Sequence, residues 1–165
     1  MNVTYRKAGI EDKNSVIELF IQLVILEASR NPTRLPEPKP EYGEQYFNKI
    51  YSYIQKGTGE IWVAEIEGNI VACAAGYIKE QFNEDLLEFK QMQIGYISDL
   101  YVRDEYRNMG IGKTLVQYIE DFFKNKGCTY FELSVTAKND GGHKFYTELG
   151  YFDYRNEMLK QTKNF

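Results

Sequence analysis

A strand pattern that runs into a glycine-containing turn and then into a helix pattern most constrains the fold of this chain. Residues 94–102 are predicted as a strand, and apolar residues at helical spacing resume after Gly110 and Gly112. Residues 130–135 are predicted as the next strand. A strand–helix–strand unit of this kind joins two parallel strands through a right-handed crossover. The chain therefore needs a sheet that is parallel at this point, with a helix on one face.

The rest of the pattern adds strands and helices on both sides of this unit, and 165 residues suit one domain, residues 1–165. We predict, in order, a strand at 3–7, helices at 11–28 and 42–57, strands at 60–67 and 70–79 joined by a Gly68-Asn69 turn, a helix at 140–149 and a last strand at 151–159. Residues 31–40 hold all four prolines and are predicted as a loop, and residues 81–91 as a loop or short helix. The predicted fold class is α/β, of the α+β type, with a mixed sheet and helices on its faces.

Charge and composition exclude several classes of protein. Asp and Glu number 24 against 20 Lys and Arg, and this net charge of −4 argues against a nucleic-acid binder. No apolar run reaches the roughly 18 residues of a membrane-spanning helix, and the N-terminus lacks the apolar core of a signal peptide. Two cysteines and one histidine are too few for a disulfide framework or a four-ligand metal cluster. We expect a cytoplasmic protein with no nucleic-acid, membrane or metal partner.

The turn before the predicted helix has the chemistry of an anion site. Unpaired N–H groups point out of the first turn of a helix, and the absent Cβ of Gly110 and Gly112 leaves room for a phosphate. Two known phosphate loops do not fit, because a Walker A loop needs glycine at Arg107 and a dinucleotide fingerprint needs it at Leu115. The alternative is that both glycines serve only the packing of the helix on the sheet.

Two motifs resemble those of the GNAT superfamily of N-acetyltransferases. Residues 107–112, Arg-Asn-Met-Gly-Ile-Gly, match the motif Q/R-x-x-G-x-G/A, and residues 97–102 resemble the strand that precedes it. Asn139, Phe145, Tyr146 and residues 150–152 match N-x(5)-F-Y-x(3)-G-[FY] at the expected distance. The resemblance covers residues 94–155, and the N-terminal half matches in the order of its elements. It implies a mostly antiparallel sheet with a splayed parallel strand pair and about four flanking helices.

The resemblance also implies a binding site for acetyl-CoA as co-substrate. The strand edge at residues 100–102 would pair with the pantetheine amides, the backbone at 108–113 would cradle the pyrophosphate, and Arg107 and Lys113 would add positive charge. The residues expected at the cofactor are Leu100, Tyr101, Val102, Arg107, Asn108, Met109, Gly110, Ile111, Gly112, Lys113, Thr114, Asn139 and Tyr146.

Two residues are candidates for the chemistry. Tyr146 aligns with the family tyrosine that protonates the coenzyme A thiolate, and its alternative role is that of a buried aromatic residue. Asp99 is the candidate base, with a structural carboxylate or a water chain as alternatives. Strand alternation places Asp99 on the same face as Ile97 and Tyr101.

The resemblance implies an N-acetyltransferase that acetylates a primary amine of a small molecule by direct attack in a ternary complex. Acetylation of a protein N-terminus or lysine, and a non-catalytic coenzyme A sensor, stay open as alternatives. Glu27 and the acidic residues at 80–88 are candidates for attracting a cationic amine, or they are solvated surface. A homodimer through the C-terminal strand is compatible with the aromatic residues there, which equally suit a core.

Overall fold

A five-stranded sheet forms the centre of the molecule in the computed structural model, which describes residues 2–30, 39–80 and 92–160. Its strands lie in the order in which they follow along the chain: β1 (Thr4–Lys7), β2 (Gly59–Ile66), β3 (Asn69–Ile78), β4 (Ile94–Val102) and β5 (Tyr130–Glu132). The first four strands are antiparallel, and β5 runs parallel to β4. The predicted mixed sheet with one parallel pair is confirmed.

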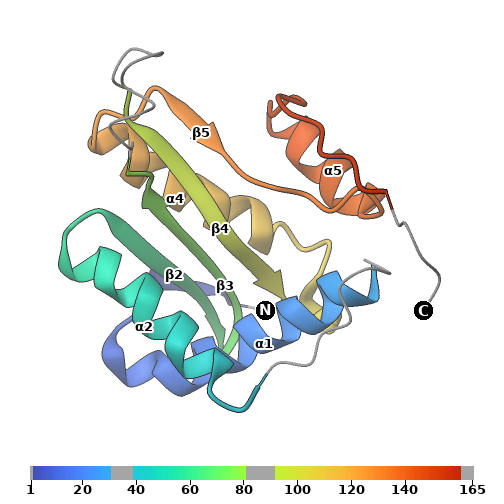
Figure 1. Cartoon of the computed structure of the whole chain (residues 1–165). Coiled ribbons are helices and arrows are strands. Elements are labelled where there is room, and N and C mark those ends of the chain that lie inside the picture. Colours follow the sequence, from blue (N-terminus) through green and yellow to red (C-terminus); the bar gives the residue numbers. More distant parts are fainter. Residues whose placement is uncertain (1, 31–38, 81–91, 161–165) are drawn as a thin grey trace.

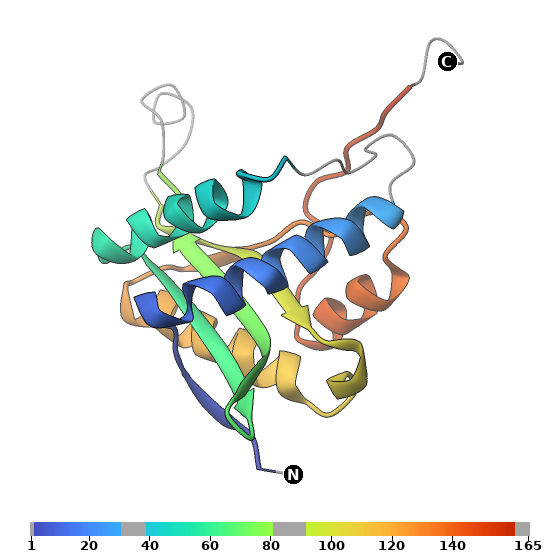
Figure 2. The ribbon, with the colours of Figure 1, turned by 90° about the horizontal axis from the view of Figure 1, so that it is seen from below.

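Helices cover both faces of this sheet (Figures 1 and 2). On one face lie α1 (Lys13–Ser29) and α2 (Tyr42–Gln55), and on the other lies α4 (Ile111–Asn125). The helix α5 (Asp140–Glu148) packs Phe145, Tyr146 and Leu149 against the α4 side. Two short 3-10 turns, η1 (Ile10–Asp12) and η2 (Asp104–Tyr106), precede α1 and follow β4. Among these described helices, none combines the length and the apolar character that a membrane crossing requires.

The helix spacing read from the sequence explains how the core fills. Ile111, Leu115, Ile119 and Phe122 recur at three- and four-residue intervals, and all four are buried against the sheet. Gly95 lets α4 approach closely, because a Cβ built there would lie 2.3 Å from the Phe123 ring.

The turn between β2 and β3 corrects one prediction by a single residue. Ile66 pairs with Asn69, so the two central residues are Glu67 and Gly68 rather than Gly68 and Asn69. Both have positive φ, 51° and 79°. A two-residue hairpin turn with positive φ at both positions matches the twist of the strands, and glycine then takes the second position.

The C-terminal region corrects two further predictions. The strand β5 ends at Glu132 rather than at residue 135, because its pairing with β4 covers three residues before the strands diverge. The predicted last strand is wrong, because residues 151–160 form no strand. Tyr151 still packs against the α4-side core, but Phe152 and Met158 are 81% and 97% exposed, so the core does not cover their side chains. The predicted loops at 31–40 and 81–91 lie mostly or wholly outside the described residues.

Candidate functional site

The divergence of β4 and β5 creates the candidate site. Pairing runs from Ile94 opposite Tyr130 to Tyr96 opposite Glu132. Farther along β4, residues 97–102 keep β3 on one side and have no strand partner on the other among the described residues. Leu100, Tyr101 and Val102, which the sequence predicts to contact the cofactor, lie on this open edge. An extended ligand with amide groups can add to such an edge by backbone hydrogen bonds.

A β-bulge in β4 changes the face on which its side chains lie. Ala75 pairs with Asp99 while Gly76 pairs with Ile97, which leaves Ser98 as the extra residue. One inserted residue reverses the alternation. Ile97 therefore packs on the α4 side, whereas Tyr101 packs with α1 and α2. The prediction that Ile97 shares a face with Asp99 is wrong, because strand alternation does not reveal a bulge.

The N-terminus of α4 meets the open end of β4. Gly110 is its N-cap residue with φ 79°, and a Cβ there would have nothing within 4 Å. The first helical bond runs from Thr114 N to Gly110 O at 3.1 Å, so the N–H groups of residues 111–113 precede the hydrogen-bonded helix. Asn108 also has positive φ, 62°, and Met109 is 55% exposed. Free N–H groups and an open approach at a helix N-terminus are the features of an anion-binding site. We call the backbone at residues 108–113 the anion cradle.

Helix packing does not by itself explain the two glycines. A Cβ on Gly112 would lie 3.6 Å from Phe145 and 3.7 Å from Leu100 and Val102, which is ordinary contact. At Gly110 the surrounding space is open, and only its positive φ requires glycine. The packing alternative is therefore the weaker one. These contacts also place the start of α4 beside β4 and α5.

The Arg107 side chain shapes the turn between β4 and α4. Its Nε donates to Val102 O at 3.0 Å, and its Nη2 lies 2.6 Å from Asp104 Oδ1. The guanidinium also lies 5.7 Å from the centre of the Tyr101 ring. Arg107 therefore holds the loop that leads to the anion cradle, in addition to any charge that it presents to a ligand. Lys113, in the first turn of α4, is exposed.

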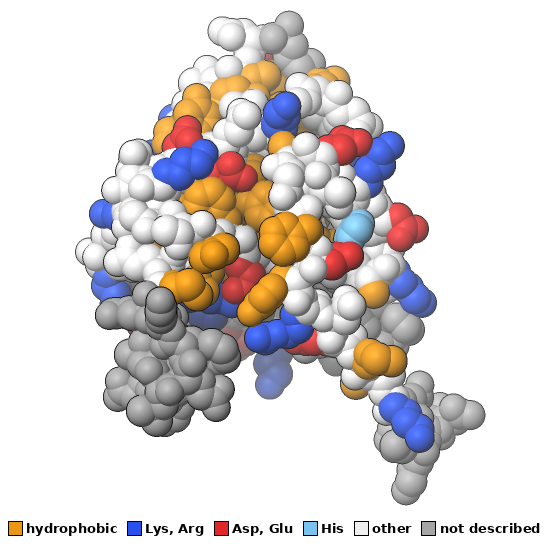
Figure 3. All heavy atoms as spheres, turned by 90° about the horizontal axis from the view of Figure 1, so that it is seen from above, with side chains coloured by type: hydrophobic (Ala, Val, Ile, Leu, Met, Phe, Trp, Pro, Cys, Tyr) orange, Lys and Arg blue, Asp and Glu red, His pale blue; other side chains and the backbone are white. Residues whose placement is uncertain are grey.

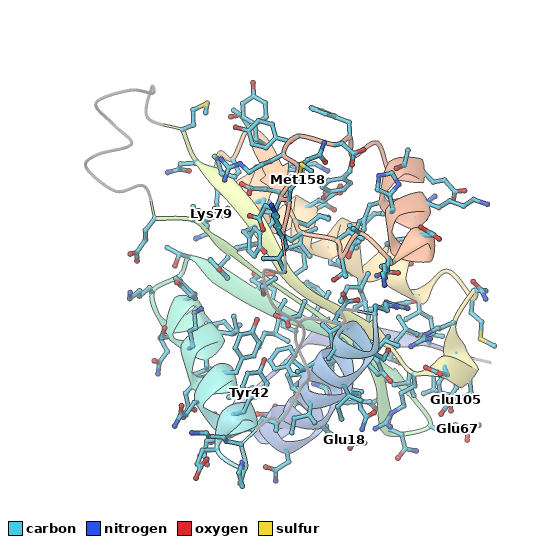
Figure 4. The ribbon with its side chains drawn as sticks, turned by 45° about the vertical axis from the view of Figure 1, so that its right-hand side comes forward. Glu18, Tyr42, Glu67, Lys79, Glu105 and Met158 are labelled. Carbon is cyan, nitrogen blue, oxygen red and sulfur yellow. The ribbon has the colours of Figure 1, made fainter. Side chains whose placement is uncertain are left out.

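Asp99 lies on the α1 and α2 face, almost fully buried at 7% exposure. The hydroxyl of Tyr46, on α2, donates to its Oδ2 at 2.9 Å. Burial raises the pKa of Asp99 to about 6, against the lowering effects of Ser98, Tyr46 and the positive charge of Lys49. Sequence reasoning missed Tyr46 as a site residue. The available signal was the aromatic stripe of α2, on which Tyr42, labelled in Figure 4, lies one turn before Tyr46.

Tyr146 is half-buried on α5, where it makes T-shaped contacts with Phe145 and Tyr151 at 5.0 and 5.7 Å between ring centres. Burial raises its pKa above the usual range, and the negative charges of Asp99 and Glu27 raise it further. The phenol therefore stays protonated near neutral pH. The structure thus brings both candidate residues for the chemistry within electrostatic reach of each other, although they lie 47 positions apart in the sequence.

A bridge centred on Glu27 joins α1 to the segment before α5. Its carboxylate accepts hydrogen bonds from Thr136 Oγ1 and, at 3.2 Å, from Asn139 Nδ2, and it pairs with Arg30 at 2.9 Å. Asn139 Oδ1 accepts from Gly142 N at 2.9 Å and so caps α5. Glu27 is therefore a structural partner of the predicted site residue Asn139, whose side chain is engaged at both ends.

Cysteine and histidine are two further residue types that can carry catalytic or metal-binding chemistry. Cys128 is buried, and His143 on α5 lies 2.9 Å from Asp153 and is exposed. Across residues 2–30, 39–80 and 92–160, no three His, Cys, Asp or Glu side chains form a group that could hold a metal ion. Hydrophobic side chains gather at the centre of the face seen from above, with charged side chains around them (Figure 3).

Comparison with known proteins gives consistent matches. The family model described as acetyltransferase (GNAT) family matches residues 24–151. A thialysine N-epsilon-acetyltransferase of Bos taurus is 30% identical over 92% of this chain and 85% of its own length. An uncharacterized N-acetyltransferase of Methanocaldococcus jannaschii is 24% identical over 90% of this chain, which spans 60% of that relative.

The fold of this chain is also similar to that of a solved structure. A protein from Clostridium acetobutylicum described as a predicted acetyltransferase, solved with acetyl-CoA, superimposes with a TM-score of 0.76 over 97% of this chain and 96% of its own, at 18% identity. At this identity the likeness concerns the fold.

Proposed function

The chain belongs to the acetyltransferase (GNAT) family, and we propose that it is an N-acetyltransferase that moves an acetyl group from acetyl-CoA to a primary amine of a small molecule. The observation that carries this proposal is the meeting of three features: the open edge of β4, the N-terminus of α4 and the buried carboxylate of Asp99. An open strand edge suits the amide-rich arm of coenzyme A, and a helix N-terminus suits its pyrophosphate.

Acetyl-CoA binds, in this proposal, through backbone groups more than through side chains. Residues 100–102 pair with the arm, and the N–H groups of residues 111–113 face the pyrophosphate, with Lys113 adding charge. The open space at Gly110 supports this role, since any side chain there would stand where the phosphates approach. Asn139 positions α5, and through it Tyr146, at the other end of the arm.

Asp99 acts as the base in the proposed reaction. An alkylammonium group with a pKa of about 10.4 is neutral in only about one molecule in a thousand near pH 7.4, which corresponds to roughly 4 kcal/mol. With a pKa of about 6, Asp99 is mostly ionised at pH 7 and accepts this proton directly or through water. The amine nitrogen then attacks the thioester carbonyl carbon, the carbon–sulfur bond breaks, and the second proton of the nitrogen is released to solvent, as is the proton held by Asp99. The departing thiolate takes the proton of Tyr146, which regains one from solvent.

A small amine is the acceptor that best fits the available comparisons. The Bos taurus relative, which this chain matches along most of both lengths, is named for thialysine, a small amino acid with a terminal primary amine. The negative charge of Asp99 favours a cationic acceptor of this kind.

An assay of thiol release from acetyl-CoA tests the proposal. The panel contains thialysine, lysine, polyamines, amino sugars and short peptides, and calorimetry measures coenzyme A binding separately. We expect amine-dependent thiol release with a small amine. Release with peptides alone would replace the small acceptor by a protein. Coenzyme A binding without release across the panel would favour a sensor, and absence of binding would overturn the proposed cofactor site.

A further inference from the structure

We infer that Tyr46 is a positioning residue for Asp99: its hydroxyl holds the carboxylate in place and keeps it ionised at the pH at which it accepts a proton. The inference rests on the proposed function, because it concerns the base of that reaction. Tyr46 lies on α2, outside the two sequence motifs, and 53 positions from Asp99.

The hydrogen bond between the two side chains is of ordinary length and is largely shielded from water. The Tyr46 hydroxyl donates to Asp99 Oδ2 at 2.9 Å, and Asp99 is 7% exposed. A hydrogen bond to a carboxylate is stronger when the carboxylate is buried, because the ionised group then has few water molecules as alternative partners. The Ser98 hydroxyl is a second partner that lowers the pKa of Asp99, and it also lies 3.3 Å from Ala75 O, to which it can donate. Tyr46 is the partner that reaches Asp99 from a different element, α2.

The Tyr46 ring is itself fixed by other rings. It stacks on Tyr42 with 5.6 Å between ring centres and an interplanar angle of 11°, and it meets the edge of Phe20 at 5.3 Å. Burial and the charge of Asp99 both raise the pKa of Tyr46 far above its usual range. The phenol is therefore a hydrogen-bond donor at every pH at which the protein is assayed.

Several other titratable groups interact electrostatically with Asp99, so their ionisation could also affect its pKa. They are Tyr42 and Lys49 from α2, Cys73 and Tyr77 from β3, and Tyr146 from α5. Burial raises the pKa of each of the three tyrosines and of the thiol, to about 12 for Tyr77. These four groups stay neutral between pH 5 and pH 8, so they do not produce an ionisation near pH 6.

The test compares Tyr46→Phe with Tyr42→Phe, which removes a hydroxyl from the stacked neighbour and leaves the bond to Asp99 intact. Carbon-13 NMR titration of the Asp99 carboxyl, without substrates, measures its pKa in each folded protein. Loss of one bond to the charged form raises this pKa by about one unit. Because the pKa starts near 6, kcat/KM for the amine then falls about fivefold at pH 6 and changes little at pH 8.

Each outcome decides a separate question. A raised pKa of Asp99 in Tyr46→Phe, with an unchanged pKa in Tyr42→Phe, supports the inference. An unchanged pKa in Tyr46→Phe, or an equal rise in both variants, overturns it, since a general packing effect would then explain the result. If the unaltered protein acetylates no amine, the proposed function fails, while the NMR titration still decides the role of Tyr46. Circular dichroism and thermal unfolding establish that both variants are folded.

Discussion

Single residues at the site show two different reasons for their identity. Gly110 is required by its backbone, with φ 79° and open space around the missing Cβ. Gly142 is favoured by its neighbour, because a Cβ there would lie 2.6 Å from Asn139 Nδ2 and the side chain that caps α5 would have to shift. The reason for Gly110 is local, because it lies in the turn before a helix that the sequence pattern already predicts. The reason for Gly142 is a contact with the folded-back side chain of Asn139, which the sequence pattern does not reveal.

Gly110→Ala is expected to lower the free energy of unfolding by roughly 1–2 kcal/mol, because an L-residue is strained at positive φ. Urea denaturation measures this. Gly141→Ala is the matched control, since Gly141 also has nothing within 4 Å but lies in the first turn of α5 without a positive φ. An equal loss in both variants would contradict the backbone explanation.

Tyr146→Phe is expected to lower the turnover number roughly tenfold to hundredfold, because it removes the proton of the proposed general acid while the ring packing stays. Thiol-release kinetics at saturating substrates measure the effect. Tyr151→Phe serves as control, since its hydroxyl bonds Glu120 at 2.9 Å on the α4 side. Unchanged turnover in Tyr146→Phe would remove this residue from the mechanism.

At the scale of elements, the site depends on how α1, β4 and α5 are held around the gap beside β4. Arg103 at the end of β4 pairs with Glu18 on α1 at 2.8 Å, and the Glu27 bridge holds α1 to the start of α5. Figure 4 labels Glu18 on α1, on the same side of the sheet as Tyr42 of α2. The gap itself comes from the short pairing of β4 with β5.

Glu27→Gln is expected to loosen the start of α5, because the neutral amide binds Thr136, Asn139 and Arg30 less strongly than the carboxylate does. Amide hydrogen exchange should quicken severalfold at residues 139–146, and KM for acetyl-CoA should rise. In Glu18→Gln, on the same helix, exchange at these residues should stay unchanged. Exchange that stays slow in Glu27→Gln would show that the bridge does not hold α5.

At the scale of the whole molecule, burial of a carboxylate couples stability to pH. The raised pKa of Asp99, about 6, means that the folded protein binds a proton that the unfolded chain releases above about pH 4. The folded state therefore loses stability from this group as pH rises from 4 to 6. Asp12 acts in the opposite sense, because hydrogen bonds from Arg6 lower its pKa and its contribution is lost in acid.

The free energy of unfolding of the native protein, compared with that of Asp99→Asn, should fall by about 2–3 kcal/mol between pH 4 and pH 6. Above about pH 7, one unit beyond the folded-state pKa, the difference between the two proteins should be constant. Urea denaturation at half-unit pH intervals measures it, and the exposed pair partner Asp121 offers the control variant Asp121→Asn. A difference independent of pH would show that the pKa of Asp99 is not raised.

The sequence determined the elements of this protein wherever a pattern is local. The order of strands and helices, the buried face of α4 and the strand–turn–helix unit follow from periodicity and glycine, which act within one or two turns of chain. The predicted parallel pair followed as well, because a crossover through one helix leaves little choice.

Only the tertiary structure decided which side chains meet at the site. The bulge at Ser98 depends on the register with β3, and it alone moves Ile97 to the face opposite Asp99. Tyr46 reaches Asp99 across 53 positions, and Glu27 reaches Asn139 across 112. Residues 151–159 have the sequence pattern of a strand, but among the described residues they pair with no other strand. A periodic pattern shows which face of an element is apolar, whereas register and partner arise between segments that only the folded chain brings together.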